Sequence, residues 1–336
     1  MRVRRNQNIE GIPIMFDVAG IGSALMDFTI EVDEAVLGRL GLTKGTMQLV
    51  DEERSRSVLA VLASYPMQKT PGGSAANTVA GVSVLGGRGL FIGKVGNDDF
   101  GALYRSESER VGVAVRLAGH ERLTGHAITL ITPDGERTFA THLGAALFLR
   151  KEDIAEADIA QARILHIEGY LLEDPDLKAA SLRAMEIAHR CGAQVSIDLA
   201  DPALIQRNFD EFHTLAKERA DILFVNEEEA ETFTGKKGAQ AAEVLGGYSR
   251  IAVVKLGGKG SIVHSGGRSI EIPSYKVDAV NTNGAGDMYA AGFLYGLAHG
   301  LPLERCGRIA SHAAALVVAQ VGARLTSRIY ADQIGM

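Results

Sequence analysis

Residues 163–199 read "RILHIEGYLLEDPDLKAASLRAMEIAHRCGAQVSIDL" and place a helix-length segment between two short apolar runs. The runs "RILHIEG" and "AQVSIDL" are typical of buried strands, and "DILFVN" and "RIAVVKL" continue the alternation further along the chain. Strands that alternate with helices of this length favour right-handed βαβ units and a parallel sheet covered on both faces. We therefore predict an α/β fold, a doubly wound sandwich with a mostly parallel central sheet.

The first half of the chain is less regular. "FDVAGIG" and "GLFIGKVG" predict two more strands, but "HAITLITPDGERTFATH" has two alternating runs around Pro133, Asp134 and Gly135. This pattern predicts a β-hairpin, and because no helical segment covers it, the hairpin is a candidate lid. "DFTIEVDE", from Asp27, would supply another lid strand. We predict an N-terminal extension over 1–16, one domain over 17–325 with lid strands from about 27–34 and 113–148, and a C-terminal tail over 326–336.

The composition indicates a globular protein and excludes several classes of partner. The 336 residues are 46% hydrophobic and 23% charged, which is enough for a substantial core. The net charge of -6 gives no general attraction to nucleic acid, and the basic run at 2–5 is interpreted as a solvated tail. Cys191 and Cys306 are too few for a disulfide framework or a zinc site. With no apolar run of membrane-spanning length and no signal peptide, we expect a cytoplasmic protein that binds neither nucleic acid nor membrane.

Three glycine-rich segments are candidates for ligand binding. "GIGSALMD", from Gly20, lacks the third glycine of a dinucleotide fingerprint and continues as strand, which argues against a Rossmann site. Asp27 is instead interpreted as a carboxylate that hydrogen-bonds vicinal hydroxyls of a sugar, the alternative being a solvated turn. "KLGGKGS" is not a Walker A motif, because no lysine in it is followed directly by Ser or Thr, and this turn joins two predicted strands.

"PGGSAANTVAGVSVLGG", at 71–87, places glycines at the entrance of a helix made of small residues. In one interpretation Ser74 caps the helix and the small residues allow close packing against a sheet. In the other, Gly73, Ser74 and Asn77 form a substrate-binding turn, beside backbone N–H groups that lack intrahelical partners. The segment alone leaves both interpretations open.

"NTNGAGDMYAAGFLYGL", at 281–297, leads from three small residues into a carboxylate at the start of an apolar helix. A helix N-terminus carries about half a positive charge and free N–H donors, so Gly284, Ala285 and Gly286 are candidates for an anion hole. Asp287 is either an ordinary N-cap or a general base. A carboxylate beside an anion hole is what phosphoryl transfer to an alcohol requires.

These segments together resemble the ribokinase-like (PfkB) carbohydrate kinase family. "GGSAANTVAGVSVLGG" is similar to its N-terminal signature and "NTNGAGDMYAAGFLYGL" to its C-terminal one. "GKVGNDDFG", "NEEE" and "VVKLGGKGS" fall between them in the family's order, so the resemblance covers about 17–321. It implies a ribokinase-like fold, a doubly wound domain with a small β-sheet lid over the sugar site, as the alternation already predicts.

The resemblance also implies roles for individual residues. Asp287 would activate a primary hydroxyl while the N–H groups of Gly284, Ala285 and Gly286 hold the phosphoryl group that leaves ATP. Asn226 and Glu229 match an N-x-x-E pattern that orders Mg²⁺ through water, the alternative being a charged helix start. The sugar hydroxyls would meet Asp27, Gly73, Ser74 and Asn77, and the nucleotide would meet Asn226, Lys255, Gly257 and Gly258. Lys255 stands where many members have Thr.

Asn281 departs from the family pattern. Members commonly have Asp at this first position of the C-terminal signature, where the region often binds a monovalent cation. Without that formal charge the electrostatic attraction for the cation is weaker. A monovalent cation is therefore doubtful as a cofactor here.

The motifs indicate the alcohol acceptor less specifically than they indicate the family. "GIGSALMDFTIEVDEAVLGRLGLTKGTMQLVDEE" and "TNGAGD" are most similar to the adenosine kinase branch, so our hypothesis is phosphorylation of a ribonucleoside, adenosine to AMP. "GGSAAN" is shared with bacterial sugar kinases, and a free-sugar kinase for ribose or fructose is the alternative. A catalytically silent sugar- or nucleotide-binding protein is a third. Phe139, Leu143 and Phe148 are candidate walls for a base, and exposed lid edges would allow a homodimer.

Overall fold

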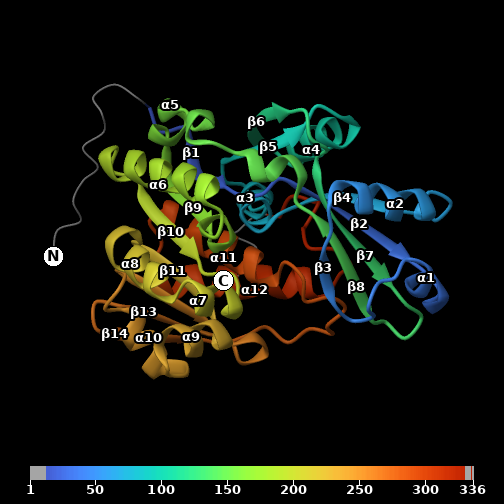
Figure 1. Cartoon of the computed structure of the whole chain (residues 1–336). Coiled ribbons are helices and arrows are strands. Elements are labelled where there is room, and N and C mark those ends of the chain that lie inside the picture. The colour runs from blue at the N-terminus through green and yellow to red at the C-terminus, as the bar shows by residue number, and fades with distance from the viewer. Residues whose placement is uncertain (1–12, 330–333, 335–336) are drawn as a thin grey trace.

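The computed structural model describes residues 13–329 and 334 and shows a large α/β body with a smaller sheet beside it (Figure 1). The large sheet has the strand order β14-β13-β12-β11-β10-β9-β1-β5-β6. Its strands are β1 (Phe16–Ile21), β5 (Gly89–Gly96), β6 (Val113–His120), β9 (Ala162–Glu168), β10 (Gln194–Asp198), β11 (Ile222–Asn226), β12 (Ile251–Lys255), β13 (Ser261–Ser265) and β14 (Arg268–Ile272). From β6 to β12 the neighbours pair parallel, and β13 and β14 pair antiparallel.

Helices cover both faces of this sheet, because its strands are apolar on both sides. On β1, Val18 packs into one hydrophobic core and its neighbour Ala19 into the other, as expected of successive strand residues. The first core includes α3 (Ser74–Val84), α4 (Asp99–Arg110), α11 (Ala285–Ala298) and α12 (Leu303–Val318). The second includes α5 (Glu156–Ala160), α6 (Pro175–Arg190), α7 (Pro202–Arg207), α8 (Phe209–Arg219), α9 (Glu227–Thr234) and α10 (Gly238–Leu245). The predicted doubly wound α/β sandwich is confirmed.

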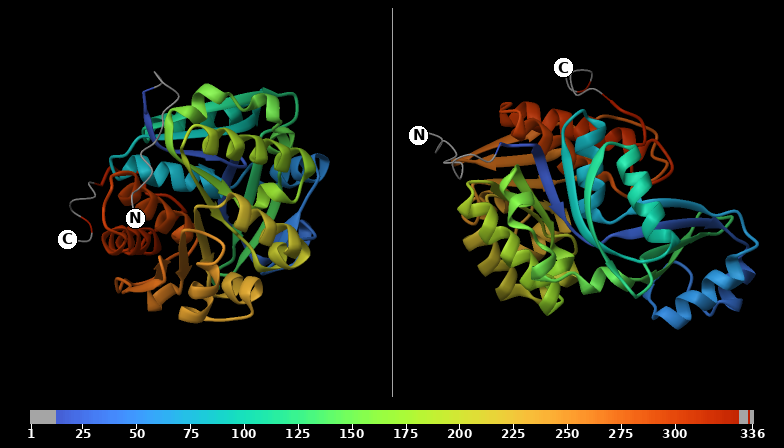
Figure 2. Two further views of the ribbon diagram at one scale, coloured as in Figure 1. Left: turned by 90° about the vertical axis from the view of Figure 1, so that its left-hand side faces the viewer. Right: turned by 90° about the horizontal axis from the view of Figure 1, so that it is seen from above.

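The smaller sheet forms the lid and has the order β3-β8-β7-β2-β4. Its strands are β2 (Leu25–Glu31), β3 (Met47–Leu49), β4 (Gln68–Gly72), β7 (Gly125–Ile131) and β8 (Arg137–His142). The hairpin predicted around Pro133 is confirmed, since β7 and β8 pair antiparallel on either side of it. The lid extends to one side of the body (Figure 2). One face of it packs on α1 (Glu34–Arg39) and α2 (Glu52–Leu62), where Phe28 and Ile30 lie in the same core as Val36 and Val58.

Three details of the lid differ from the prediction. Residues 113–120 are not a lid strand: they form β6, which pairs parallel with β5 after the crossover helix α4. The βαβ rule explains this placement, since a strand that follows a crossover helix returns to its own sheet. The lid also takes strands β3 and β4 from outside the predicted segments. Finally, helices α1 and α2 do cover the lid, but they come from residues 34–62 rather than from beside the hairpin.

The termini fall largely outside the described residues. Most of the predicted N-terminal extension is not described, and its last residue, Phe16, already begins β1. Of the predicted tail over 326–336, residues 326–329 and 334 are described, and Ile329 donates its N–H to the Val84 carbonyl at the end of α3. Across the described part of the chain, no helix has both the length and the apolar character that a membrane crossing demands.

Candidate active site

Polar residues stand at the carboxyl ends of four neighbouring strands of the large sheet. Glu168 ends β9, Asp198 ends β10, Asn226 ends β11 and Lys255 ends β12. These residues are adjacent in the sheet, because Asp198 pairs with Glu168 and Asn226 pairs with Lys255. The carboxyl ends of parallel strands are where open α/β sheets bind their ligands. The site is therefore expected at this edge.

Helix α11 begins at the same edge with the backbone geometry that an anion hole needs. Its N-cap is Gly284, which has φ of 76°. A Cβ at Gly284 would lie 2.1 Å from the Ala323 carbonyl oxygen, so only glycine fits there. The Ala285 N–H donates to the Thr282 carbonyl at 3.3 Å. Gly286 is thus better placed than Ala285 to offer its N–H to a ligand, at the positive end of the helix dipole.

Asp287 is the third residue of α11 and is not its cap. The N-cap is Gly284, with no side-chain capping bond. The Asp287 carboxylate instead accepts hydrogen bonds from Ser74 Oγ at 2.6 Å and Asn77 Nδ2 at 2.8 Å, both on α3. Burial raises the pKa of Asp287, and these two hydrogen bonds partly oppose the rise. The cap interpretation of Asp287 is therefore wrong, and so is that of Ser74, since Gly73 is the N-cap of α3.

The start of α3 also meets a carboxylate from the lid. Asp27 lies within the lid strand β2, and a Cβ at Gly72 would be only 2.3 Å from its Oδ2. Its carboxylate therefore packs on the backbone of the turn before Gly73 and Asn77. Burial raises the pKa of Asp27 to about 6; Arg324 opposes the rise and Asp287 adds to it. The structure thus brings the predicted sugar-binding residues together.

Glu168 is a further carboxylate at this turn, and the sequence analysis missed it. It accepts hydrogen bonds from the backbone N–H groups of Ser23 at 2.9 Å and Ala75 at 2.8 Å. Burial raises the pKa of Glu168 to about 7, although both hydrogen bonds oppose this. A signal for Glu168 was present, because an acid at the end of a predicted parallel strand points to the ligand edge.

Two arginines far away in the sequence also reach the site, and both were missed. Arg137, on lid strand β8, donates from Nη1 to Asn281 Oδ1 at 2.5 Å. Asn281 Oδ1 also accepts the Asn283 N–H at 3.0 Å, so this side chain links the lid to the loop before α11. Arg324, after α12, donates to Asn77 Oδ1 and to the Gly72 carbonyl. No local pattern in the sequence marks either arginine.

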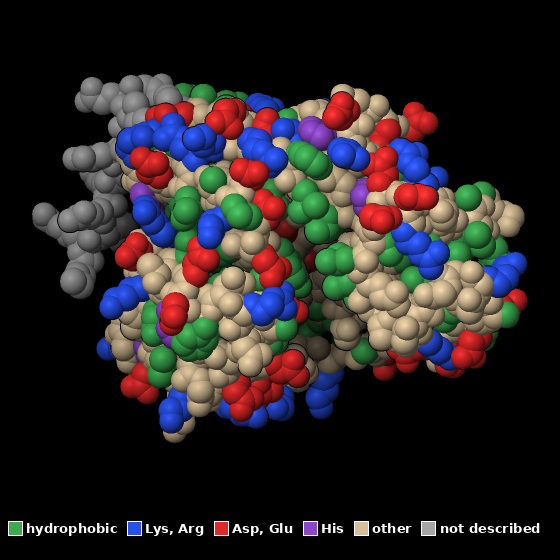
Figure 3. Space-filling model, in the orientation of Figure 1, with side chains coloured by type: hydrophobic (Ala, Val, Ile, Leu, Met, Phe, Trp, Pro, Cys, Tyr) green, Lys and Arg blue, Asp and Glu red, His purple; other side chains and the backbone are tan. Residues whose placement is uncertain are grey.

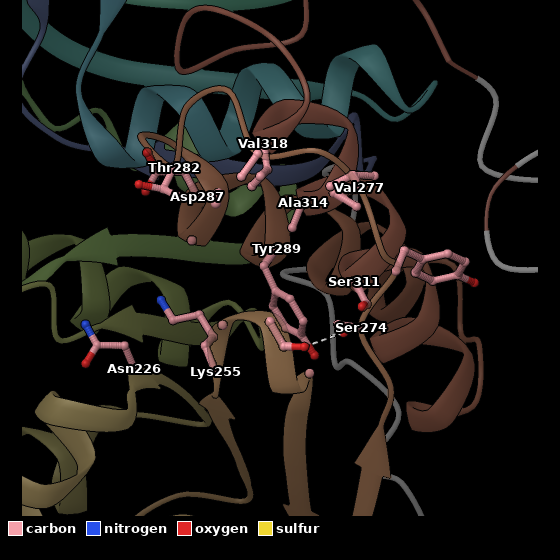
Figure 4. A pocket seen from close by; sticks show the side chains of 18 of the residues that line it. Asn226, Lys255, Ser274, Val277, Thr282, Asp287, Tyr289, Ser311, Ala314 and Val318 are labelled. Atoms are coloured by element: carbon pink, nitrogen blue, oxygen red, sulfur yellow. Dashed lines mark hydrogen bonds between the residues drawn. The ribbon is translucent and has the colours of Figure 1, made fainter. Parts of the chain in front are cut away.

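A cavity of about 910 Å³ opens beside Asp287. Figure 3 shows the surface hollowed between the body and the lid, with hydrophobic side chains along the hollow. The predicted nucleotide residues Asn226, Lys255, Gly257 and Gly258 all line this cavity, together with Gly286. Its other end is apolar and is lined by Val277, Ala279, Ala314, Ala315 and Val318. Figure 4 shows Lys255 and Asn226 on one side of the cavity and Asp287 and Thr282 on another.

Lys255 places a buried positive charge at the start of α11. Its Nζ lies 2.7 Å from Asp198 Oδ2, and the two side chains are 14% and 7% exposed. A Cβ at Gly286 would lie 3.3 Å from the same Nζ. Burial lowers the pKa of Lys255, but the charges of Asp198 and Glu229 outweigh burial and leave the pKa above its usual value. Lys255 is therefore charged at neutral pH and lies beside the candidate anion hole.

Asn226 and Glu229 form a capping box at the start of α9. The Asn226 side chain accepts the Glu229 N–H at 2.8 Å, and Glu229 Oε2 accepts the Asn226 N–H at 2.8 Å. Burial raises the pKa of Glu229 to about 7, and the charge of Asp198 adds to this effect. Within 13–329 and 334, no group of three or more His, Cys, Asp or Glu is arranged to hold a metal ion directly. Carboxylate oxygens at the cavity wall suit a hard cation such as Mg²⁺ held through water.

The three aromatic and aliphatic candidates for a base wall do not share one surface. Phe139 lies two residues after Arg137 on β8, and side chains two residues apart on a strand point to the same face. Both side chains therefore lie on the lid face that meets Asn281. Leu143 and Phe148 instead line a separate cavity of about 320 Å³ with Leu49. Leu143 and Phe148 therefore do not line the cavity beside Asp287, and their role as walls for the base of an acceptor stays a prediction.

This fold and site define a kinase that acts on a small molecule. The chain belongs to the pfkB family of carbohydrate kinases, whose family profile matches residues 41–329. A 5-dehydro-2-deoxygluconokinase of Listeria monocytogenes is 30% identical over 282 residues, which cover 78% of this chain and 86% of that protein. The crystal structure of adenosine kinase from Sinorhizobium meliloti has a TM-score of 0.83 and 34% identity, covering 93% of this chain and 97% of that one. The structure of a probable sugar kinase from Rhizobium etli has a TM-score of 0.84 and 32% identity, with 93% and 96% covered.

Proposed function

We propose that this enzyme transfers the γ-phosphoryl group of ATP to the 5′-hydroxyl of a ribonucleoside, converting adenosine to AMP. The observation that carries the proposal is the Asp287 carboxylate, which lies beside the N-terminus of α11 and accepts hydrogen bonds from Ser74 and Asn77 rather than capping its helix. A buried carboxylate with a raised pKa is suited to accept a hydroxyl proton.

The residues at the start of α11 supply both the base and the N–H donors for the transfer. Asp287 takes the proton of the 5′-hydroxyl while the oxygen of that hydroxyl forms a bond to the γ-phosphorus, and the bond from this phosphorus to the bridging oxygen of ADP breaks. The backbone N–H groups of Gly284, Ala285 and Gly286 hold the equatorial oxygens of the transferred group, with Gly286 the best placed. Positioned donors of this kind stabilise charge in the transition state. The Lys255 ammonium, beside Gly286, adds a full positive charge.

The 910 Å³ cavity is proposed as the ATP site. Its apolar end, which includes Val277 and Val318, suits a base, and Gly257 and Gly258 let the nucleotide approach the backbone closely. Asn226 and Glu229 would hold Mg²⁺ through water at the polar end. When bound, Mg²⁺ supplies positive charge that neutralises the phosphate oxygens.

The charges around Gly72, Gly73 and the first turn of α3, which together are called the acceptor turn, favour a neutral acceptor. Three carboxylates lie there among the described residues, those of Asp27, Glu168 and Asp287, and the guanidinium groups of Arg324 and of Arg137 on the lid oppose them. Lys255 is already paired with Asp198. A gluconate, as in the name of the Listeria relative, is an anion and would meet an excess of negative charge, whereas a nucleoside is neutral. Asp27, Gly73, Ser74 and Asn77 would then bind ribose hydroxyls.

Two observations support a nucleoside over a free neutral sugar. Phe139 offers an aromatic surface on the lid face that meets the site, which suits a base. The Sinorhizobium meliloti neighbour, at 34% identity, is an adenosine kinase. The second candidate, a kinase for ribose or fructose, is favoured by the likeness to the Rhizobium etli probable sugar kinase.

A turnover panel separates these candidates. ADP formation is measured with ATP and, in turn, adenosine, guanosine, cytidine, ribose, fructose and 5-dehydro-2-deoxygluconate. We expect the highest kcat/KM with adenosine. Turnover with the free sugars alone would refute the nucleoside proposal, and a preference for the gluconate would refute the charge argument. Phe139→Ala is expected to raise the KM for adenosine and to leave that for a free sugar unchanged.

The lid also supports the predicted homodimer. Strand β3 is one edge of the lid sheet, and its Met47 and Leu49 side chains are 61% and 65% exposed. An exposed apolar edge is a surface for pairing with a second copy. Light scattering is expected to give the mass of a dimer for the wild type and of a monomer for Met47→Lys. A monomeric wild type would contradict this proposal.

A further inference from the structure

We propose that Arg324, which follows α12, is a positioning residue for phosphoryl transfer: its guanidinium fixes the Asn77 amide, and that amide orients the Asp287 carboxylate. The inference rests on the proposed function, because it assigns Arg324 to the same reaction. It goes beyond that function by adding a residue from the C-terminal segment that does not itself meet the reacting atoms.

The Arg324 guanidinium is held by two acceptors at the acceptor turn. Its Nε donates to Asn77 Oδ1 and its Nη2 donates to the Gly72 carbonyl at 3.0 Å. The same carbonyl accepts the Tyr104 hydroxyl at 2.9 Å. Because the guanidinium is a rigid planar fork, two such contacts fix its orientation.

This contact determines which way the Asn77 amide faces. Arginine has only donors, so the Asn77 oxygen must face Arg324 and the Asn77 nitrogen must face away from it. The nitrogen then donates to Asp287 Oδ2 at 2.8 Å. With the amide turned over, its oxygen would face the Asp287 carboxylate, and two acceptors would repel each other. Asn77 is only 8% exposed, so water has little access to hydrogen-bond and stabilise the reversed amide.

The chain segment that carries Arg324 also supports the anion hole. The Ala323 carbonyl oxygen lies against Gly284, where a Cβ would be 2.1 Å away. Gln320 Nε2 donates to the Arg324 carbonyl at 2.7 Å and holds this segment at the end of α12. One short segment therefore packs on the loop that holds the phosphoryl group and, through Arg324, on the turn that orients the base.

Arg324 also faces a second carboxylate of the acceptor turn. Its positive charge lowers the pKa of Asp27, which burial raises, while the negative charge of Asp287 raises it further. Loss of Arg324 would therefore leave the buried Asp27 carboxylate without this counter-charge. This effect adds to the loss of amide orientation and appears in the KM of the acceptor rather than in that of ATP.

A double-mutant cycle distinguishes positioning from a purely structural role. We expect Arg324→Gln and Asn77→Ala each to lower kcat with adenosine about 10²-fold, the scale for a misplaced reacting group. The double variant is expected to have nearly the kcat of Asn77→Ala alone, because Arg324 acts through Asn77. Arg324→Lys should recover part of the loss, since an ammonium still donates to the Asn77 oxygen. The control Arg308→Gln, an exposed arginine of α12 paired with Glu304, should keep the wild-type kcat.

Two kinetic results would overturn the proposal: a normal kcat for Arg324→Gln, or fold-losses that multiply in the double variant. The KM for ATP should not change in any variant, and thermal unfolding of Arg324→Gln and Arg324→Lys checks that each is folded. The Asn77 side-chain amide is followed separately by NMR in the wild type and in Arg324→Gln. A wild type that phosphorylates no nucleoside refutes the proposed function, whereas an unchanged Asn77 amide in Arg324→Gln refutes the role of Arg324.

Discussion

Replacement of Lys255 by Met separates the stability of the site from its catalytic role. Lys255 and Asp198 form a buried pair with 2.7 Å between Nζ and Oδ2, and Glu229 adds a second carboxylate nearby. Lys255→Met leaves Asp198 buried without its counter-charge, which costs about 3–5 kcal/mol of unfolding free energy. For a chain of this size that loss lowers Tm by about 4–7 °C. The kcat should fall as well, because Lys255 lies beside Gly286.

The double variant Lys255→Met/Asp198→Asn removes both charges. Its Tm should return close to that of the wild type, since no unpaired carboxylate remains at that position. Its kcat should stay about 10²–10³-fold low, because the transferred phosphoryl group still lacks the ammonium. Thermal unfolding by circular dichroism and turnover at saturating ATP and adenosine measure the two effects separately.

Lys178→Met is the matched control for this experiment. Lys178 pairs with Glu211 at 2.8 Å, but the two side chains are 31% and 38% exposed. A surface pair of this kind contributes about 0–1 kcal/mol, so both Tm and kcat should stay near the wild-type values. The reasoning is refuted if the double variant recovers turnover together with stability, because Lys255 would then only balance the charge of Asp198.

Three further predictions follow from the same geometry. Gly286→Ala places a methyl group 3.3 Å from Lys255 Nζ, so kcat should fall about 10²-fold with Tm unchanged, and a normal kcat would remove Gly286 from the anion hole. Burial raises the pKa of Asp27 to about 6 and of Glu168 to about 7, and it also raises that of Asp287, so these carboxylates lose their charge as pH falls. The kcat/KM for adenosine should therefore fall from pH 8 to pH 5.5, and a flat profile would contradict this. Because Asn281 lacks a formal charge and accepts from Arg137, replacing KCl by tetramethylammonium chloride should leave turnover unchanged; activation by KCl would contradict this.

Much of the fold was predictable because its signals are local. The alternation of apolar runs and helical segments after residue 163 identified strands β9 to β12, and the turn at Pro133 identified the β7–β8 hairpin. Strand β6 was misplaced because a short alternating run looks the same in either sheet, and only the crossover through α4 decides between them. Helices α1 and α2 cover the lid because they pack with Phe28 and Ile30. No local sequence pattern predicts this packing.

The site was predictable where one motif carried the residues. Ser74, Asn77 and Asp287 lie in two glycine-rich motifs, and the structure joins them by hydrogen bonds over more than 200 positions of sequence. Arg137 and Arg324 were not predictable, because each is a single arginine whose partner lies 144 or 247 positions away. Their roles depend on how the lid and the C-terminal segment pack, and that packing is a property of the folded chain.

The central claim is that Asp287 is the general base, and the turnover of Asp287→Asn tests it most directly. Asparagine keeps the size of the side chain but cannot accept the hydroxyl proton. We predict a kcat with ATP and adenosine that is about two to four orders of magnitude below the wild type, with unchanged binding of ATP by calorimetry. An Asp287→Asn enzyme with near-normal kcat would contradict the account.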